Sequence, residues 1–369
     1  MHFLKSVPRY LAVNNEMSYT EVLFEEMKGQ GSNLGIITLN RPAALNSLNQ
    51  AMVLAMHEKL LEWESAKHIK AVIIKAAEGS RAFCAGGDLR SAYEQMKAHA
   101  PVTDFFRDEY QLNRKIFHYT KPYIALLDGI TMGGGVGISI HGSHRVATEK
   151  LLFAMPETGI GFFPDVGGSY FLPRLPNKTG IYLGLTGARI KTDACMETGI
   201  ATHKISHEVI PDLIQELAKQ VYANNPREDV SNIIQSFSTP VTQTEFEQHE
   251  ETINQCFAYN KMEEILQALK KDGTAFSQQA EEMIAKKSPT SLKVSLQAML
   301  EGSQKTFDEC MRLEYRLVSR FLRCHDFQEG IRAVIIDKDQ KPVWDPSSIQ
   351  AVTDQDVLSY FAPLQQELA

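Results

Sequence analysis

Met132-Gly133-Gly134-Gly135-Val136-Gly137 is a glycine turn that follows an apolar run at 123–127 and leads into the start of a helix. Glycine lets the backbone approach a ligand closely, because it has no Cβ. The free N–H groups of a first helical turn favour a negatively charged oxygen. A second glycine turn, Phe83-Cys84-Ala85-Gly86-Gly87-Asp88, comes after another apolar run at 71–74. Both runs are typical of buried strands, so we expect two strand-to-turn connections.

A third segment, residues 155–168, reads Met-Pro-Glu-Thr-Gly-Ile-Gly-Phe-Phe-Pro-Asp-Val-Gly-Gly and carries Glu157 and Asp165. Two N–H groups aimed at one carbonyl oxygen form an oxyanion hole, and losing one donor costs roughly 3–4 kcal/mol of transition-state stabilisation. Carboxylates beside such a hole serve as base, acid or nucleophile. Each segment alone is compatible with a plain turn. The three together predict acyl chemistry on a thioester.

The chain resembles the crotonase (enoyl-CoA hydratase/isomerase) superfamily, and within it the 3-hydroxyisobutyryl-CoA hydrolase branch, over about residues 19–344. The similarity is carried by the three segments above and by LNRPAALNSL (39–48), FFRDEY (105–110) and DFQEGIRA (326–333). It implies an α/β fold whose core is a repeated ββα spiral, followed by a mainly helical C-terminal region. It also implies that the oxyanion N–H groups belong to Gly87 and Gly134, that a coenzyme A loop includes Asp88 and Arg90, and that Glu109 contacts the substrate.

One position departs from the hydratase pattern. Enoyl-CoA hydratases use two glutamates to handle a water molecule, and the first of these matches Gly137 in this chain, whereas the second matches Glu157. The broken pair predicts poor hydratase activity. Asp165 and Glu109 follow the pattern of the hydrolase branch instead.

The catalytic roles of the three carboxylates can be assigned in more than one way. Glu157 either attacks the thioester to give a mixed anhydride or deprotonates a water molecule that attacks, and the sequence leaves both routes open. Asp165 either orients that water or gives a proton to the leaving thiolate. Glu109 is expected to accept a hydrogen bond from a hydroxyl of the acyl group. Taken by its spacing alone, Glu109 would lie on the solvated side of an amphipathic helix.

Composition excludes several classes of protein. The 369 residues are 43% hydrophobic and 22% charged, which is typical of a globular protein. A net charge of −7 and the absence of a long basic run argue against nucleic-acid binding. The sequence has no apolar stretch of about 20 residues, so no membrane partner is expected. No histidine spacing suggests a metal, and we expect no cofactor, because coenzyme A is part of the substrate.

The five cysteines are odd in number and far apart, so they are interpreted as reduced thiols. Cys84 lies beside the first glycine turn, but no base lies near it in the sequence. We therefore interpret it as a small packing residue. The compartment predicted from these features is cytoplasmic, with the mitochondrial matrix as the alternative, because residues 1–15 faintly resemble a transit peptide.

The chain divides into three parts by its pattern: an N-terminal arm (1–18), the crotonase-like α/β core (19–225) and a helical region (226–369) that packs on the core and helps to close the acyl pocket. Strands are predicted at 71–75, 123–127 and 145–147. Asn46 or Ser47 is the expected cap of the helix that begins directly after them. Ser288-Pro289 predicts a helix start, and a long helix is expected over 306–324. Assembly into a homo-oligomer is compatible with the sequence.

The prediction is therefore hydrolysis of a short 3-hydroxyacyl-CoA thioester, with 3-hydroxyisobutyryl-CoA of valine catabolism as the first choice. Two alternatives remain open. One is an enoyl-CoA hydratase or isomerase, and the other is a non-catalytic scaffold that keeps the crotonase fold.

Overall fold

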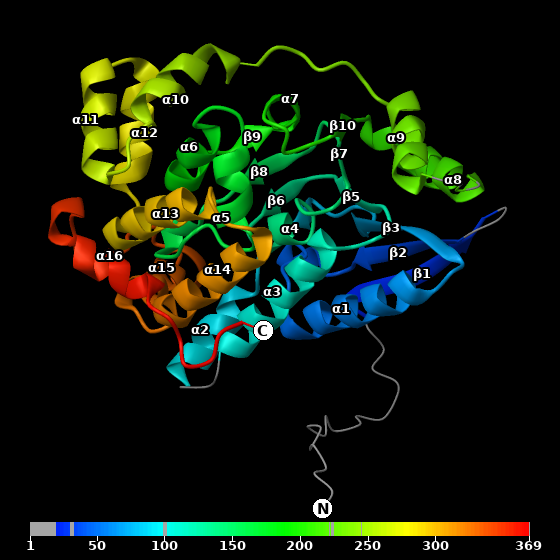
Figure 1. Cartoon of the computed structure of the whole chain (residues 1–369), viewed down its shortest axis with the longest axis horizontal. Coiled ribbons are helices and arrows are strands. Elements are labelled where there is room, and N and C mark those ends of the chain that lie inside the picture. Colours follow the sequence, from blue (N-terminus) through cyan, green and yellow to red (C-terminus); the bar gives the residue numbers. More distant parts are fainter. Residues whose placement is uncertain are drawn as a thin grey trace, which may run out of the picture.

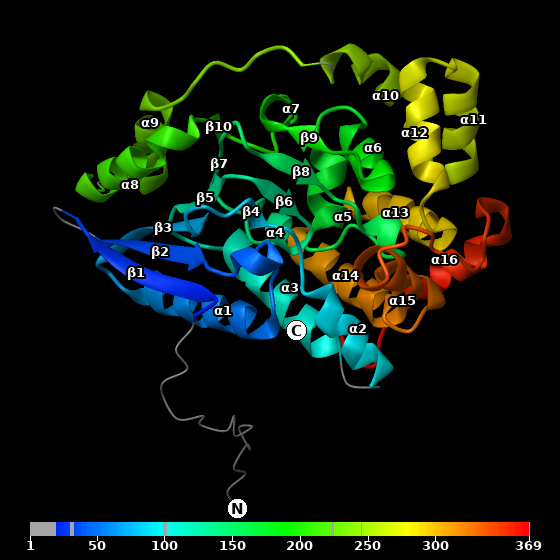
Figure 2. The same ribbon diagram turned by 180° about the vertical axis from the view of Figure 1, so that it is seen from behind.

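The computed structural model describes residues 20–29, 33–98, 102–220, 222, 225–244 and 246–368. The predicted N-terminal arm, residues 1–18, lies outside these described residues. The described strands form a six-stranded sheet with the order β1-β2-β3-β5-β7-β10 and a four-stranded sheet with the order β4-β6-β8-β9 (Figures 1 and 2). The strands are β1 (Val22–Lys28), β2 (Asn33–Leu39), β3 (Ile69–Ala76), β4 (Ala82–Cys84), β5 (Tyr123–Leu127), β6 (Ile130–Met132), β7 (His144–Ala147), β8 (Leu152–Ala154), β9 (Ile190–Lys191) and β10 (His203–Lys204).

The chain alternates between the two sheets. β3, β5 and β7 enter the six-stranded sheet, and β4, β6 and β8, which directly follow them, enter the four-stranded one. All three strands of each set run parallel to their neighbours in the set. Each repeat therefore gives one strand to each sheet before a helical segment follows, which is the repeated ββα spiral that the resemblance implies.

This topology brings the three sequence segments together. The two glycine turns and the Glu157 segment begin directly after β4, β6 and β8, which are adjacent parallel strands. Their carboxyl ends therefore meet at one edge of the small sheet, where ligands of parallel sheets commonly bind. The two long apolar runs form the predicted strands, as β3 and β5, but they do not lead directly into the glycine turns. The three-residue strands β4 and β6 lie between them and are too short to show a periodicity.

The helices cover both sheets. Those of the core are α1 (Gln50–Ser65), α2 (Leu89–Lys97), α3 (Thr103–Phe117), α4 (Gly134–Gly137), α5 (Gly168–Phe171), α6 (Thr179–Thr186), α7 (Thr192–Glu197), α8 (Ile210–Lys219) and α9 (Pro226–Ser236). The later ones are α10 (Glu250–Cys256), α11 (Met262–Asp272), α12 (Ala275–Ala285), α13 (Pro289–Gly302), α14 (Phe307–Phe321), α15 (His325–Ile331) and α16 (Asp354–Phe361).

The cap of α1 differs from the prediction. Asn49, not Asn46 or Ser47, accepts the Met52 N–H at 2.9 Å. Asn46 is buried instead and donates from Nδ2 to the Ala82 carbonyl, which ties the turn before α1 to β4. The expected Ser288 cap is confirmed, because its side chain accepts a hydrogen bond from the first turn of α13. The long helix expected over 306–324 is α14, and the structure adds that Thr306 caps it.

The helical C-terminal region lies directly on the core. α14 packs against α3, and α13 packs against α5 and α6 (Figure 1). On the far side of the six-stranded sheet, α8 and α9 pack together over a second apolar cluster that includes Ile73, Ile124 and Leu213. The predicted boundary between the α/β core and the helical region, at residue 225, thus falls between α8 and α9, which lie on the same face of the six-stranded sheet. None of the described helices combines the length and apolar character that a membrane span requires.

Candidate active site

The two glycine turns touch each other at the edge of the small sheet. An ideal Cβ built on Gly134 would lie 3.3 Å from the Gly86 carbonyl carbon. Leu48 donates its N–H to the Gly86 oxygen and accepts the Asp88 N–H, both at 2.8 Å. Because this bridge uses the residues on either side of Gly87, the N–H of Gly87 itself points away from Leu48. The fold therefore brings Gly87 and Gly134 together from segments that lie far apart in the sequence.

Both proposed oxyanion donors are unengaged. Within the described ranges, neither the Gly87 N–H nor the Gly134 N–H donates a hydrogen bond to another group of the protein. Gly133 precedes the helix with φ +48°, a conformation that favours glycine. α4 is a single turn of helix, so the expected dipole contributes little. The local N–H groups themselves would supply the stabilisation.

Glu109 and Glu157 flank the Gly133–Gly134 turn. Glu109 comes from α3 and is 2% exposed, and its Oε1 lies 2.6 Å from the ideal Cβ position of Gly134. Glu157 begins the short 3₁₀ turn η2 (Glu157–Ile160), and its Oε1 lies 3.2 Å from the ideal Cβ position of Gly133. The alternative that places Glu109 on a solvated helix face is wrong, since the side chain is buried beside the glycines.

Asp165 completes a group of three buried carboxyl groups. Its Oδ2 accepts a hydrogen bond of 2.9 Å from the Tyr110 hydroxyl, which belongs to α3 like Glu109. Tyr110 is the last residue of the FFRDEY motif, but the sequence gave no role to its hydroxyl. Of the predicted site residues, Glu109 and Glu157 therefore lie beside the turn that holds Gly134, and the turn that holds Gly87 adjoins it through Gly86. The charge of Asp165 acts on both glutamates.

Burial and mutual repulsion favour the protonated form of these carboxyl groups. Burial raises the pKa of Glu157 well above its usual range, Asp165 raises it further, and Lys287 opposes the shift. Burial, then Asp165 and Glu157, raise the pKa of Glu109 in the same way. Burial raises the pKa of Asp165 to about 7, although the Tyr110 hydrogen bond lowers it. Burial and repulsion therefore oppose ionisation of all three groups at once, so that one carboxylate can accept a proton while a neighbouring carboxyl group gives one.

Two carboxylate oxygens at this point lack a partner. Glu109 Oε1 and Glu157 Oε2 are buried and have no hydrogen-bond partner among the described residues. Orphaned buried oxygens are rare in folded proteins, because each costs about 1–3 kcal/mol. Beside an oxyanion hole, they are atoms through which the protein can bind or activate a substrate.

Glu314 of α14 fixes the turn that carries Asp165. The fully buried carboxylate accepts the Gly167 N–H at 2.8 Å, the Ser169 N–H at 2.9 Å and the Ser169 hydroxyl at 2.6 Å. Val166, between Asp165 and Gly167, has φ +52°, which is strained for a β-branched residue. Glu314 therefore holds a strained turn next to a candidate catalytic carboxyl. No local pattern marks it, since it lies 147 positions away from Gly167.

The C-terminal region also holds the Glu157 turn. Ser288 donates its N–H to the Thr158 carbonyl at 3.1 Å and its hydroxyl to Asp326 at 2.6 Å. The ideal Cβ of Gly330 would lie 2.3 Å from the Ile160 carbonyl, so α15 presses directly on η2. The motif 326–333 thus supports the backbone that carries Glu157.

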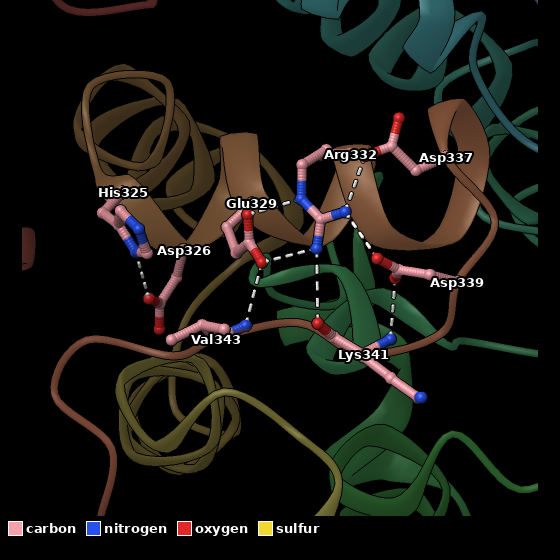
Figure 3. Close-up of polar contacts among 8 residues, drawn as sticks. All are labelled: His325, Asp326, Glu329, Arg332, Asp337, Asp339, Lys341 and Val343. Atoms are coloured by element: carbon pink, nitrogen blue, oxygen red, sulfur yellow. Dashed lines mark hydrogen bonds and ion pairs between the residues drawn. The ribbon is translucent and has the colours of Figure 1, made fainter.

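A charged network fixes the end of that motif (Figure 3). Arg332 binds Glu329 through two nitrogens at 2.8 Å and reaches Asp337 and Asp339, each at 2.7 Å. Glu329 also accepts the Val343 N–H at 2.9 Å. The network ties the segment after α15 back onto that helix, as Figure 3 shows.

Asp88 and Arg90, expected in the coenzyme A loop, lie at the start of α2. Asp88 accepts the Ser91 N–H as the helix cap and pairs with Arg41 at 2.7 Å, so its carboxylate already stabilises the loop. Arg90 is exposed and donates to the Ile335 carbonyl at 3.1 Å. Their contact with coenzyme A stays a prediction.

Cys84 is unsuited to act as a nucleophile. It is fully buried beside the glycine turn, and burial raises the pKa of its thiol to about 12. A thiol that stays protonated at neutral pH is a poor nucleophile, which agrees with the packing interpretation. In the part of the chain that the structure describes, no three His, Cys, Asp or Glu side chains gather in a way that could hold a metal ion.

The position of the missing hydratase glutamate is closely packed. An ideal Cβ on Gly137 would lie 2.6 Å from Val166 Cβ and 2.8 Å from Asn113 Nδ2. A side chain at this position would collide with buried neighbours, so a hydratase-like glutamate does not fit without rearrangement.

Comparison with known proteins now identifies the family. The sequence profile of the enoyl-CoA hydratase/isomerase family matches residues 34–361. The chain belongs to this family, the crotonase superfamily that the motifs predicted. Its resemblance to the hydrolase branch is also confirmed, as the relatives below show.

The protein named "3-hydroxyisobutyryl-CoA hydrolase, mitochondrial" from Mus musculus is 46% identical over 362 residues, which cover 96% of this chain and 92% of the mouse protein. The protein of the same name from Homo sapiens is 44% identical over 367 residues, covering 97% and 93%. Among solved structures, a carnitinyl-CoA dehydratase from Mycobacterium thermoresistibile superposes with a TM-score of 0.86 at 36% identity, covering 95% of this chain and 98% of that one. An enoyl-CoA hydratase from Rhodobacter sphaeroides gives 0.85 at 36% identity, covering 95% and 99%. These matches confirm the predicted fold.

Proposed function

We propose that this protein hydrolyses the thioester bond of a short 3-hydroxyacyl-CoA, and that 3-hydroxyisobutyryl-CoA from valine catabolism is its substrate. The observation that carries the proposal is the meeting of the Gly87 and Gly134 N–H groups with the buried carboxyl groups of Glu109, Glu157 and Asp165. The hydrolase names of relatives at 44–46% identity support the same substrate.

In this mechanism the thioester oxygen accepts hydrogen bonds from Gly87 and Gly134 as negative charge develops on it. Glu157 either attacks the carbonyl carbon or removes a proton from the attacking water. The carbon–sulfur bond then breaks, and the thiolate of coenzyme A takes a proton. With a pKa of about 7, Asp165 is suited to supply that proton near neutral pH and to be recharged by the water that is consumed. If Glu157 is the nucleophile, a water molecule then hydrolyses the mixed anhydride, which releases the 3-hydroxy acid and frees the Glu157 carboxylate.

The remaining predicted site residues are assigned to substrate binding. Glu109 would accept a hydrogen bond from the acyl hydroxyl, and Asp88 and Arg90 would lie along the coenzyme A chain. The mitochondrial names of the vertebrate relatives support the mitochondrial alternative for this chain over the cytoplasmic one. Assembly of copies into a homo-oligomer stays a prediction.

The test is a comparison of substrates with the purified protein. Thiol release from 3-hydroxyisobutyryl-CoA should be far faster than hydration of crotonyl-CoA, because Gly137 supplies no second glutamate. Comparable rates would favour a hydratase, the activity named for the Rhodobacter sphaeroides structure at 36% identity. Absence of both reactions would favour a non-catalytic scaffold.

A further inference from the structure

Asn113 is a fully buried residue with an unpaired amide. It lies one helical turn beyond Glu109 on α3, and its exposed fraction is 0%. Neither Nδ2 nor Oδ1 has a hydrogen-bond partner among the described residues. Burying such a group unpaired costs about 1–3 kcal/mol, and a leucine, whose side chain has the same branched shape but no polar atom, would carry no such cost. The amide therefore calls for an explanation outside packing.

The position of Asn113 connects it to the acyl site. Its Nδ2 lies 2.8 Å from the ideal Cβ position of Gly137 on α4, and Val166, which follows Asp165, closes the other side of that position at 2.6 Å. Glu109 lies four residues earlier and therefore on the same face of α3, where its Oε1 adjoins Gly134. α3 thus presents two buried polar groups to α4. One lies beside the oxyanion hole, and the other lies one turn, about 5.4 Å, along the helix.

The two groups are chemically complementary to a hydroxyl. Glu109 Oε1 is an unpaired acceptor, and the Asn113 amide offers an unpaired donor. A hydroxyl both donates and accepts, so it can satisfy both at once. We propose that the 3-hydroxyl of the acyl group donates to Glu109 and accepts from Asn113, and that Asn113 thereby selects hydroxylated acyl chains. This inference rests on the proposed thioester hydrolysis.

Selectivity follows from the cost of unpaired groups. An acyl chain without the hydroxyl leaves both Glu109 and Asn113 unpaired in the complex, and sites built for a hydroxyl reject such analogues by up to about 10⁴–10⁵-fold. The wild-type protein should therefore hydrolyse 3-hydroxyisobutyryl-CoA with a much higher kcat/KM than isobutyryl-CoA, which differs only by that hydroxyl.

The test measures kcat/KM by thiol release with these two thioesters for the wild type and for Asn113→Leu. The variant should lose at least about 30-fold with 3-hydroxyisobutyryl-CoA and keep or raise its kcat/KM with isobutyryl-CoA, so the ratio between substrates should collapse. Asn113→Ala gives the same comparison if the leucine variant fails to fold. Asn254→Leu is the matched control, because Asn254 Oδ1 accepts the Lys178 N–H at 3.0 Å at a site in α10, and this change should leave the ratio unaltered.

Other outcomes overturn the inference. An equal loss with both thioesters would mean that Asn113 serves the reaction or the attacking water, not the hydroxyl. An unchanged ratio in both Asn113 variants would mean that the amide is not part of the acyl site. A wild-type protein that hydrolyses the two thioesters equally would refute the hydroxyl site and leave the proposed thioesterase standing, whereas one that releases thiol from neither would overturn both.

Discussion

Gly134 is the residue at which the backbone and the carboxylates meet most closely. It has no space for a side chain, because a Cβ would lie 2.6 Å from Glu109 Oε1 and 3.3 Å from both the Gly86 carbonyl carbon and a Leu48 methyl group. The backbone position that gives the proposed oxyanion donor therefore depends on a glycine. Gly137 at the end of α4 shows the same principle, because its missing side chain leaves room for the Asn113 amide of α3.

Gly134→Val should fold and lose most of its thioesterase activity. The added methyl groups would displace the Glu109 carboxylate, the flexible end of a side chain, and would intrude on the carbonyl site. A far-ultraviolet circular dichroism spectrum like that of the wild type, with turnover reduced by about 100-fold or more, is the expected result. A well-folded variant with near-normal turnover would show that this turn only connects β6 to α4.

At the scale of an element, the Asp165–Gly168 turn stores strain and holds a proton. Val166 has a positive φ, and Glu314 and His141 hold the turn from either side, His141 through a 2.7 Å hydrogen bond to the Val166 carbonyl. Burial raises the pKa of Asp165 to about 7, so folding keeps a proton on a carboxyl group that the unfolded chain would release near pH 4. The folded state therefore loses stability as the pH rises through this window.

Asp165→Asn should remove this pH dependence. The amide keeps an acceptor for the Tyr110 hydroxyl and carries no charge. The free energy of unfolding of the variant minus that of the wild type should therefore increase by roughly 2–4 kcal/mol as the pH rises from about 4 to about 7. Denaturant titrations of both proteins at about pH 5 and about pH 8, which enclose most of this pH range, measure the difference. Asp212→Asn on the exposed side of α8 is the control. A gain that is as large at the lower pH as at the higher one would show that Asp165 is ionised in the folded protein throughout.

At the scale of the whole molecule, the C-terminal helices are part of the candidate active site. Glu314 of α14 holds the Asp165 turn, and Ser288 and Gly330 hold the Glu157 turn from α13 and α15. The sequence predicted that this region packs over the core. The structure adds that it positions both candidate catalytic turns.

Gly330→Ala tests this coupling far from the substrate. Its Cβ would stand 2.3 Å from the Ile160 carbonyl, which is backbone and cannot move aside cheaply, so η2 must shift. We expect a loss of about 2 kcal/mol or more in stability and a fall in turnover at temperatures where the variant is still folded. Thermal unfolding followed by thiol-release assays well below the midpoint separates the two effects. Turnover equal to the wild type in the folded variant would mean that α15 supports the fold but not the position of Glu157.

The sequence predicted those site residues that can be recognised from the residues next to them in the chain. The glycine turns, Glu157 and Asp165 are readable because each lies in a short segment whose residue types suit one task. The cap of α13 was predictable for the same reason, since Ser288 acts on the residues directly after it.

Long-range contacts escaped the sequence. Glu314 resembles any acid on an amphipathic helix until the fold brings it to Gly167, and Asn113 becomes notable only when its amide is found buried and unpaired. β4 and β6 were missed because three residues give no period. Asn46 was misassigned as a cap because the same side chain can bond to β4 instead.

The most direct test of the proposed mechanism is the turnover of Glu157→Gln with 3-hydroxyisobutyryl-CoA. The change keeps the shape of the side chain and removes its ability to act as base or nucleophile, so kcat should fall at least about 100-fold with little change in KM. Glu282→Gln on the exposed face of α12 is the matched control and should behave like the wild type. A Glu157→Gln protein that retains more than about a tenth of wild-type turnover, a loss below that expected for acid–base assistance, would contradict the central catalytic role of this carboxylate.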